Sequence, residues 1–265
     1  MTTVLVGGGV MGESILAGLL DSGTRPADVR VVEPRAERAD ELRDRYGVTV
    51  GPEARVDSGV DVLVVAVKPH DVPRVLAPLA ESLAADCVVV SVAAGVTTAA
   101  LESVLTVGQP VVRAMPNTPA LVRAGVSAIC AGQHATDVHL RVAETLLSSV
   151  GVVVDVPESQ IDAVAAVSGS GPAYVYLVAE ALIEAGVRVG LPRGLATELT
   201  RATISGSAQL WSETGEHPTL LRERVTSPGG TTAAALHALE ARGLRAAFSE
   251  AVVANTARSA ELGAS

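Results

Sequence analysis

Aromatic and basic side chains are scarce in this chain of 265 residues. One Trp, three Tyr and one Phe make up 2% of the sequence, and the net charge at pH 7 is −9. Proteins that bind single-stranded nucleic acids place several aromatic rings in a basic groove, and contacts to a phosphate backbone need an excess of positive charge. The composition therefore argues against a nucleic-acid partner, and it predicts a core of aliphatic side chains.

Cysteines and long hydrophobic runs are also few. Cys87 and Cys130 lie 43 residues apart and outside any CxxC pattern, so we expect two buried thiols in a reducing compartment and no metal site. Apolar runs such as Val62–Val67 are far shorter than the roughly 20 residues of a membrane helix. No basic segment precedes the first apolar run, so no signal peptide is expected. These absences predict a cytoplasmic protein without a membrane partner.

The first 155 residues alternate short apolar runs with helical patterns. The strand-like runs are Thr3–Val6, Val29–Val32, Val62–Val67, Cys87–Val92, Val111–Met115, Val126–Cys130 and Val152–Val156. Apolar residues recur at helical spacing in Met11–Ser22, Ala36–Tyr46, Thr97–Leu105 and Thr136–Ser149. Strands that alternate with helices predict an α/β fold with a parallel sheet, and continuous valine runs predict that both faces of the sheet are covered.

The pattern changes after residue 155, where strand-like runs give way to Ala-rich helices. The expected helices are Glu158–Val167, Pro172–Val189, Arg193–Trp211, Thr219–Val225, Thr231–Ala241 and Leu244–Leu262. We therefore expect two domains, an α/β domain over residues 1–155 and an all-helical domain over residues 156–265. Small side chains allow close packing, so we expect the helical domain to be a surface for association.

A glycine-rich turn follows the first strand-like run directly. Gly7-Gly8-Gly9-Val10-Met11-Gly12 has the GxGxxG pattern, in which Gly7 permits a tight turn, Gly9 a close approach of the backbone, and Gly12 close packing of helix on strand. The helix that follows presents free N–H groups and the positive end of its dipole to a pyrophosphate. The alternative is a turn that is merely rich in glycine. Its place between a strand and a helix favours a Rossmann-type, dinucleotide-binding domain.

The end of the second strand-like run bears on the choice of dinucleotide. Glu33 follows Gly12 by 21 residues, at the position where an acidic residue hydrogen-bonds the adenosine ribose of NAD. Arg35 and Arg38 come next, and an arginine there accommodates the extra phosphate of NADP. Both arginines also fit the solvated face of a charged helix. NADH and NADPH both remain open as the cofactor.

Lys68 is the only lysine in the chain, and it stands at the end of the strand-like run Val62–Val67. Ligands of open parallel sheets bind outside the carboxyl ends of the strands. A single lysine in a chain that otherwise uses arginine indicates a site for a compact ammonium group. The alternative is an incidental surface lysine. His70 is either catalytic or a cap of the next helix.

Three further segments place polar groups or glycines beside helix starts. Pro116 and Pro119 bracket Asn117 and Thr118 rigidly, which is typical of a pocket wall or of a structural turn. Ser168-Gly169-Ser170-Gly171-Pro172 opens a helix with proline in its first turn. Ser227-Pro228-Gly229-Gly230-Thr231-Thr232 precedes another helix, where free N–H groups and Thr hydroxyls suit a small carboxylate or simply cap the helix.

In their order along the chain, these motifs resemble those of pyrroline-5-carboxylate reductases. The resemblance spans the whole chain and includes the glycine-rich turn, Ala66-Val67-Lys68-Pro69, Val92–Val96, Arg113–Pro119, Ser168–Tyr174 and Ser227–Thr232. It implies an N-terminal Rossmann domain and a helical C-terminal domain that forms dimers, which assemble into decamers. It also implies the last step of proline biosynthesis, in which NADH or NADPH reduces the cyclic imine Δ1-pyrroline-5-carboxylate to L-proline.

The resemblance also implies site residues, carried over by position. The pyrophosphate site would comprise Val6, Gly7, Gly8, Gly9, Val10 and Met11, and the adenosine-ribose site Glu33, Pro34 and Arg35. Neighbours of the ribose and nicotinamide would be Val67, Lys68, Ala94 and Asn117. The substrate would be bound by Glu158, Ser227, Gly230, Thr231 and Thr232, with the Thr232 hydroxyl hydrogen-bonded to the ring nitrogen as the catalytic group. Many members carry an Asn in the loop that reads Gly51-Pro52-Glu53-Ala54 here, which, with Glu33, counts against tight binding of NADPH.

Two rival interpretations remain. β-Hydroxyacid dehydrogenases use a lysine of the helical domain as acid and base, and this chain has no lysine after residue 68. A non-catalytic dinucleotide sensor would keep Gly7–Gly12 but would have little need of Ser227–Thr232. Such a sensor would bind NAD(P)H without turning over any imine.

Overall fold

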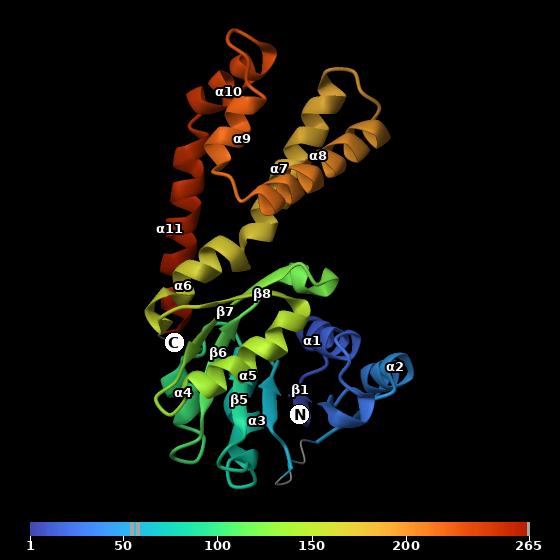
Figure 1. Ribbon diagram of the computed structural model, residues 1–265, viewed down its shortest axis with the longest axis vertical. Helices are drawn as coiled ribbons and strands as arrows, with labels where there is room; N and C mark the ends of the chain where they lie inside the picture. Colours follow the sequence, from blue (N-terminus) through green and yellow to red (C-terminus); the bar gives the residue numbers. More distant parts are fainter. Residues whose placement is uncertain (54–55, 57–58, 264–265) are drawn as a thin grey trace. The chain divides into compact units, whose positions relative to one another are not determined.

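The computed structural model describes residues 1–53, 56 and 59–263, so Ala54 of the loop above lies outside the described residues. The chain divides into two compact units (Figure 1). One comprises Met1–Ser170 with Asn255–Ser265, and the other comprises Gly171–Ala254.

A sheet of eight strands, counted over the described residues, forms the centre of the first unit, in the order β3-β2-β1-β4-β5-β6-β7-β8. The strands are β1 (Thr3–Val6), β2 (Val29–Val32), β3 (Thr49–Gly51), β4 (Val62–Val65), β5 (Val88–Ser91), β6 (Val111–Met115), β7 (Gly125–Ala131) and β8 (Gly151–Asp155). β3, a strand of three residues, is not among the strands expected from the sequence. The strand order reverses between β1 and β4, which is where open α/β sheets bind their ligands.

The parallel sheet expected from the sequence is confirmed with one correction. β7 pairs with β6 in the antiparallel direction, while the other adjacent strands are parallel. A parallel crossover needs a dozen or more residues. Only residues 116–124 join β6 to β7, so the chain reverses direction there.

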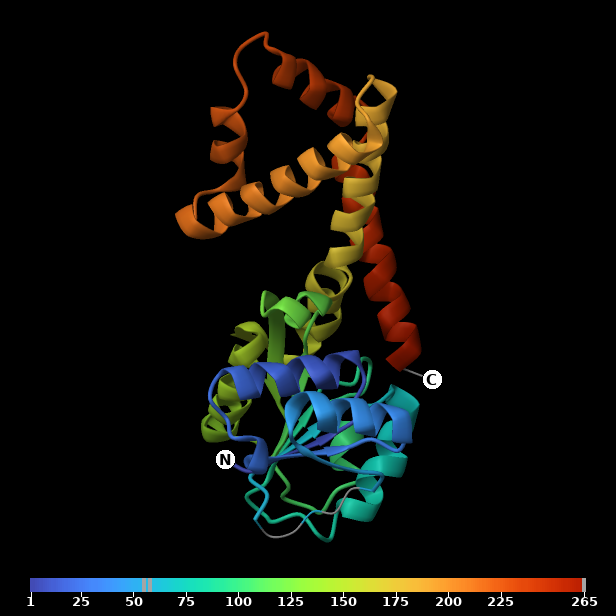
Figure 2. The same cartoon turned by 90° about the vertical axis from the view of Figure 1, so that its right-hand side faces the viewer.

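Both faces of the sheet are covered by helices, as the valine runs predicted. The helices of this unit are α1 (Val10–Asp21), α2 (Ala36–Tyr46), α3 (Val72–Leu76), α4 (Thr98–Glu102), α5 (Asp137–Leu147) and α6 (Ile161–Val164). On one face Leu5 and Val64 pack with Leu16 of α1 and Leu146 of α5. Alternate strand residues point to the other face, where Leu63 packs with Leu76 and Leu101 of α3 and α4. Helices α1 and α2, blue in Figure 2, lie on the same side of the sheet.

The segment after β8 packs on the sheet, although the sequence analysis assigned it to the helical domain. Ile161 is buried against Ala128 and Cys130 of β7, with Val164 beside it. A π-helical turn, Ala165–Gly169, then follows α6 where a single helix had been expected. The first compact unit therefore extends to residue 170, well beyond the change of composition at residue 155. The domain boundary expected at residues 155–156 remains a prediction.

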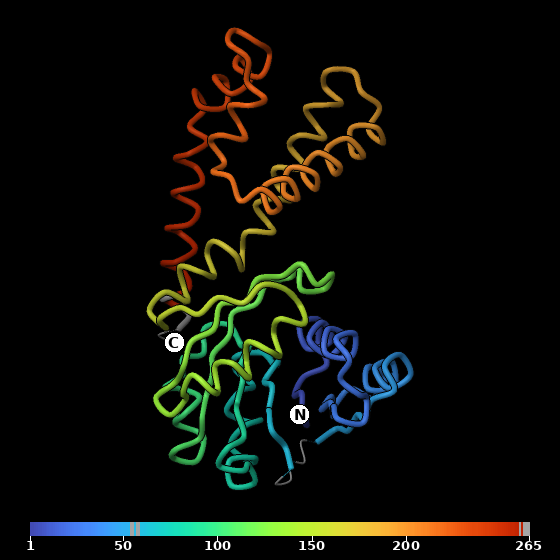
Figure 3. The backbone as a smooth tube through the Cα atoms, in the orientation of Figure 1, coloured from blue at the N-terminus to red at the C-terminus, as the bar shows by residue number. Residues whose placement is uncertain are grey.

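Helices are the only regular secondary structure among the described residues of the second unit, as expected. It contains α7 (Gly171–Arg188), α8 (Arg193–Thr214), α9 (Pro218–Arg224), α10 (Thr231–Ala241) and the first half of α11 (Leu244–Gly263), which Figure 3 traces to the red end of the chain. None of the described residues of α7 is buried, and the exposed side chains include Tyr176, Leu177 and Leu182. Exposed apolar surface of this extent marks a face for association.

One described helical stretch, Glu158–Arg188, is long and apolar enough to cross a membrane by length and composition alone. Only 11% of its most apolar window is buried. Polar residues are scattered through this stretch, so it contains no long uninterrupted apolar run and was not expected from the sequence. One such stretch is weak evidence for a membrane span, because helices of soluble proteins also meet this criterion.

Candidate functional site

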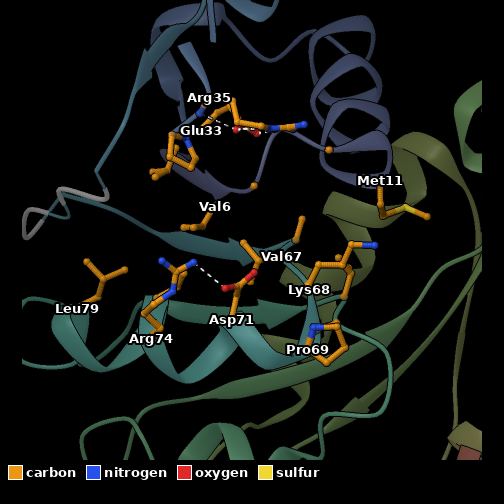
Figure 4. A pocket seen from close by; sticks show the side chains of 18 of the residues that line it. Val6, Met11, Glu33, Arg35, Val67, Lys68, Pro69, Asp71, Arg74 and Leu79 are labelled. Atoms are coloured by element: carbon orange, nitrogen blue, oxygen red, sulfur yellow. Dashed lines mark hydrogen bonds and ion pairs between the residues drawn. The ribbon is translucent and has the colours of Figure 1, made fainter. Parts of the chain in front are cut away.

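A cavity of about 990 Å³ opens where β1, β2, β4 and β5 end (Figure 4). Its lining contains many of the residues expected to bind the cofactor: Val6, Gly7, Gly9, Val10, Met11, Glu33, Pro34, Arg35, Val67, Lys68 and Ala94. These residues come from four separate segments, which the parallel strands bring to one edge of the sheet. Gly8 and Asn117, also expected there, are not part of the lining.

The three glycines of the GxGxxG pattern, Gly7, Gly9 and Gly12, meet different surroundings. Gly7 has a φ of +107°, and a Cβ there would overlap the carbonyl oxygen of Ala66. A Cβ on Gly12 would overlap the carbonyl oxygen of Gly7. Around Gly9, in contrast, no described atom lies within 4 Å of the position a Cβ would take. The protein itself therefore requires Gly7 and Gly12, whereas Gly9 leaves space open toward the cavity.

Gly9 is also the N-cap of α1. No side chain caps the helix there in the described structure, so its first N–H groups stay free for a ligand. Free N–H groups and the helix dipole together form a site for an anion. The open space at Gly9 and this uncapped helix start fit the diphosphate of a dinucleotide.

Gly8 is buried and is held from both sides. Its N–H donates to Glu33 Oε2 at 3.1 Å, and its carbonyl oxygen accepts from Arg38 Nε at 2.9 Å. Arg38 is further held by ion pairs with Glu13 and Glu41. Gly8 therefore anchors the turn to Glu33 and Arg38 and does not line the cavity.

Glu33 is 4% exposed, and its carboxylate also binds Arg35. The Arg35 backbone N–H and Nε donate to Oε1 at 3.0 and 2.9 Å, and Nη2 donates to Oε2 at 3.1 Å. Burial by itself raises the pKa of Glu33, but the hydrogen bonds from Arg35 and Gly8 outweigh it and hold the pKa below its ordinary value. Glu33 is therefore ionised and fully engaged at the edge of the cavity.

The wall that follows β4 carries Lys68 and residues of the next turn and helix. Lys68 is exposed and lines the cavity. Asp71 and Arg74, which the sequence analysis did not single out, also line it and form an ion pair at 2.6 Å. Their one signal in the sequence is their position soon after the end of a strand. His70 is 79% exposed, lies outside the lining and sits 3.5 Å from Asp71. Asp71, and not His70, precedes α3, and no side chain caps that helix in the described structure, so the geometry supports neither catalysis nor capping by His70.

Asn117 is 9% exposed and uses both ends of its amide inside the protein. Its Nδ2 donates to the Ser168 carbonyl oxygen at 3.1 Å, and its Oδ1 accepts from the Val126 N–H at 2.9 Å. The side chain thus links the start of β7 to the π-helical turn. Of the two interpretations of this loop, the structure favours the structural turn.

Glu158 lies in the first unit and is bound by residues from two other elements. The N–H and the hydroxyl of Thr98 donate to its carboxylate at 2.7 and 2.6 Å, and Arg113 Nη1 donates at 3.0 Å. The Arg113 side chain is 6% exposed, whereas that of Glu158 is 31% exposed. Burial raises the pKa of Glu158, but the hydrogen bonds from Thr98 and Arg113 outweigh this effect and hold the pKa below its ordinary value. The carboxylate is therefore ionised near neutral pH. No motif pointed to Thr98 in the sequence.

The remaining candidate residues surround the start of α10 in the second unit. Gly230 precedes the helix with extended backbone, at φ −79° and ψ 176°, and no side chain caps it in the described structure. The Gly230 N–H donates to the Ser227 carbonyl oxygen at 3.0 Å, which closes the turn at Gly229, where φ is +69°. Ordinary capping by Ser or Thr is therefore absent at Gly230. The first N–H groups of α10 thus have no side-chain cap, and Thr231 and Thr232 stand at the same helix start, an arrangement of residues that suits a small anion.

Comparisons with known proteins cover both units. The family model "Pyrroline-5-carboxylate reductase dimerisation" matches residues 158–262, and "NADP oxidoreductase coenzyme F420-dependent" matches residues 2–95. The chain is 46% identical over 268 residues to a pyrroline-5-carboxylate reductase of Corynebacterium melassecola, with 99% of each chain covered.

Solved structures agree with the sequence relatives. The pyrroline-5-carboxylate reductase of Coxiella burnetii superposes with a TM-score of 0.94 at 38% identity, with 98% of each chain covered. The pyrroline carboxylate reductase of Plasmodium falciparum with NADP bound gives a TM-score of 0.86 at 28% identity, covering 99% of this chain and 98% of that one. The chain therefore belongs to the pyrroline-5-carboxylate reductase family of NAD(P)-dependent oxidoreductases.

Proposed function

We propose that this protein reduces Δ1-pyrroline-5-carboxylate to L-proline with NADH or NADPH. The observation that carries the proposal is the cavity at the strand-order reversal, where Gly9 leaves open space at an uncapped helix start. A second uncapped helix start, at Gly230, offers donors for a carboxylate. A dinucleotide and a small carboxylic acid are the two ligands that this chemistry requires.

The first site binds the cofactor through backbone and side-chain groups of the cavity. The N–H groups from Gly9 onward hold the diphosphate, and Lys68 adds a positive charge on the facing wall. Val67 and Ala94 form the wall beside the nicotinamide, and Glu33, Pro34 and Arg35 form the adenosine end. When bound, the reduced nicotinamide supplies a hydride.

The second site binds the substrate at the start of α10. Reduction of an imine needs a hydride at carbon and a proton at nitrogen, and a protonated iminium is already electrophilic. The protein therefore contributes positioning more than a strong acid. The N–H groups of Thr231 and Thr232 hold the carboxylate, and the Thr232 hydroxyl hydrogen-bonds the ring nitrogen. Gly230 and Ser227 close the turn that leads into the helix, through the bond from the Gly230 N–H to the Ser227 carbonyl oxygen.

Two residues of the first unit support this chemistry. Glu158 keeps an exposed edge and an ionised carboxylate, which attracts the positive charge of an iminium. Asn117 acts at a distance from the cavity, because it holds Ser168 in the segment that leads into α7. We assign Glu158 to substrate binding and Asn117 to positioning.

Association and location complete the proposal. Exposed apolar residues along α7 support a homodimer through the helical unit, and we propose that dimers assemble further into a decamer.

Burial raises the pKa of the Cys87 thiol to about 12 and that of Cys130 to about 11, which suits unreactive thiols of the cytoplasm. The acidic composition supports neither a nucleic-acid nor a membrane partner.

Loss of NADH and of NADPH absorbance with racemic pyrroline-5-carboxylate tests the activity directly. We expect turnover and the formation of L-proline, with each cofactor measured separately. Folded protein that binds a cofactor but turns over no imine would overturn the proposal in favour of a sensor.

A further inference from the structure

Two charged side chains meet at the adenosine end of the cavity. The buried Glu33 carboxylate accepts four hydrogen bonds from the protein: one from Gly8 and three from Arg35. An ionised carboxylate offers about four lone-pair positions. In this arrangement Glu33 has no acceptor position left for a ligand.

This saturation matters because NAD is recognised through its ribose hydroxyl. An acid at the end of the second strand normally accepts a hydrogen bond from the 2′-hydroxyl. Glu33 accepts such a bond only after Arg35 leaves. Arg35 itself lines the cavity, its side chain is 67% exposed, and its Nη1 donates to none of the described residues. The group presented to a ligand is therefore a guanidinium.

The other charged residues nearby do not change this balance. Arg38, the second candidate for a phosphate, is 19% exposed and is committed to Gly8, Glu13 and Glu41. Two further carboxylates line the cavity. Asp71 pairs with Arg74, and Glu53 is exposed, so that solvent and salt screen its charge.

We infer that Glu33 is a positioning residue that holds Arg35 at the adenosine end of the cavity, and that this site selects the 2′-phosphate of NADPH over the 2′-hydroxyl of NADH. The inference rests on the cofactor site of the proposed function and names its preferred ligand. A guanidinium held in a fixed plane binds a phosphate through two parallel hydrogen bonds. The buried carboxylate fixes that plane and also orients the turn through Gly8.

Calorimetric titration of the full-length protein with 5′-AMP and with adenosine 2′,5′-bisphosphate tests the inference without any need for turnover. Wild type should bind the bisphosphate about tenfold to a hundredfold more tightly, which is the usual range for hydrogen bonds to a charged group. Arg35→Ala should lose this preference and bind 5′-AMP no more weakly, since Glu33 is then free to accept the 2′-hydroxyl.

Glu33→Gln separates a positioning role from direct recognition of ribose. With its bidentate partner gone, Arg35 loses its orientation, so the preference for the bisphosphate should fall toward that of Arg35→Ala. If Glu33 recognised ribose directly, Glu33→Gln would instead weaken 5′-AMP and strengthen the bisphosphate. Arg25→Ala is the matched control. Arg25 forms the same bidentate pair with Asp28, at 2.8 Å for both bonds, outside the cavity lining, and its loss should leave both affinities unchanged.

Equal affinities of wild type for the two nucleotides, or tighter binding of 5′-AMP, would overturn the inferred preference for NADPH. The proposed function would still stand if the protein reduces pyrroline-5-carboxylate. Failure of both nucleotides to bind would overturn the cofactor site itself, and with it the proposed function. If Glu33→Gln does not fold, Arg35→Ala and wild type still decide the preference.

Discussion

Two helices of this protein begin at a glycine in almost the same backbone conformation, one in each compact unit. Gly9 precedes α1 at φ −70° and ψ −173°, and Gly230 precedes α10 at φ −79° and ψ 176°, both without a side-chain cap. Their support differs. α1 buries Ile15, Leu16 and Leu19 against the sheet, whereas none of the described residues of α10 is buried.

The difference shows how one local motif can be supported in two ways. Glu33 and Arg38 hold the turn before α1 through Gly8, so the cavity is formed within the single chain. The turn before α10 is closed by its own backbone, at Ser227 and Gly230. Local geometry is thus shared by the two helix starts, but rigidity comes only from what packs around them.

The largest effect should come from removing the space that the first turn needs. Gly12→Ala places a Cβ against the Gly7 carbonyl oxygen, so we expect a loss of about 3 kcal/mol or more in the free energy of unfolding. Gly9→Ala meets no described atom within 4 Å and should keep stability within about 1 kcal/mol. It should nevertheless weaken NAD(P)H binding more than about tenfold, because the methyl group enters the phosphate cradle.

Urea unfolding and cofactor fluorescence measure these two quantities separately. If Gly9→Ala bound the cofactor like wild type, the open space at Gly9 would not be the diphosphate site, and the contrast between the two helix starts would lose its functional meaning.

The second helix start should respond through the reaction and hardly through stability. Thr232→Ala removes the hydroxyl assigned to the ring nitrogen, and kcat/KM should fall about a hundredfold. Cofactor affinity and the urea midpoint should stay close to wild type, because the first turn of α10 buries no described residue. Steady-state kinetics with NADPH and racemic substrate provide the measurement. Full kcat/KM in Thr232→Ala would remove Thr232 from the mechanism.

The smallest effect concerns one ion pair in each unit. Glu158→Gln leaves the buried Arg113 with a weaker partner and should lower the free energy of unfolding at pH 7 by about 1–3 kcal/mol. Glu240→Gln breaks the exposed pair with Arg245, whose side chains are 48% and 71% exposed, and should change stability by less than about 0.5 kcal/mol.

The pH dependence distinguishes the same two pairs. The folded-state pKa of Glu158 lies below its ordinary value, about 4.3 for an unfolded chain. Its contribution is therefore complete above that value and is lost as pH falls through the lower folded pKa. Between pH 7 and pH 3, the free energy of unfolding should fall less steeply in Glu158→Gln than in wild type. In Glu240→Gln it should fall as steeply as in wild type. Parallel slopes for all three proteins would contradict the assigned network.

Most of the sheet could be predicted from the sequence because its strands are continuous valine runs. β3 escaped because it has three residues, one of which, Val50, is buried. The reversed direction of β7 escaped because an apolar run carries no information about strand direction, which the length of the connection at residues 116–124 decides. The π-helical turn at Ala165–Gly169 left no trace in the periodicity of its small residues.

The candidate site was predictable where the requirement is steric and local. Gly7 and Gly12 are needed because a Cβ at either position would overlap neighbouring backbone. Such a constraint is visible in the sequence as glycines at fixed spacing. Lys68 could be found for a different reason: it follows the end of β4 by three residues, and strand ends are visible as the ends of apolar runs.

By itself, the sequence determined the two-part organisation, the glycine turn and the family to which the chain belongs, because these rest on periodicity and on short motifs. Only the tertiary structure decided which polar groups are paired. It joined Glu33 to Gly8 and Arg35, Asn117 to Val126 and Ser168, and Glu158 to Thr98 and Arg113. A buried polar group must find a partner, and the partner is whichever group the packing of distant elements brings within about 3 Å.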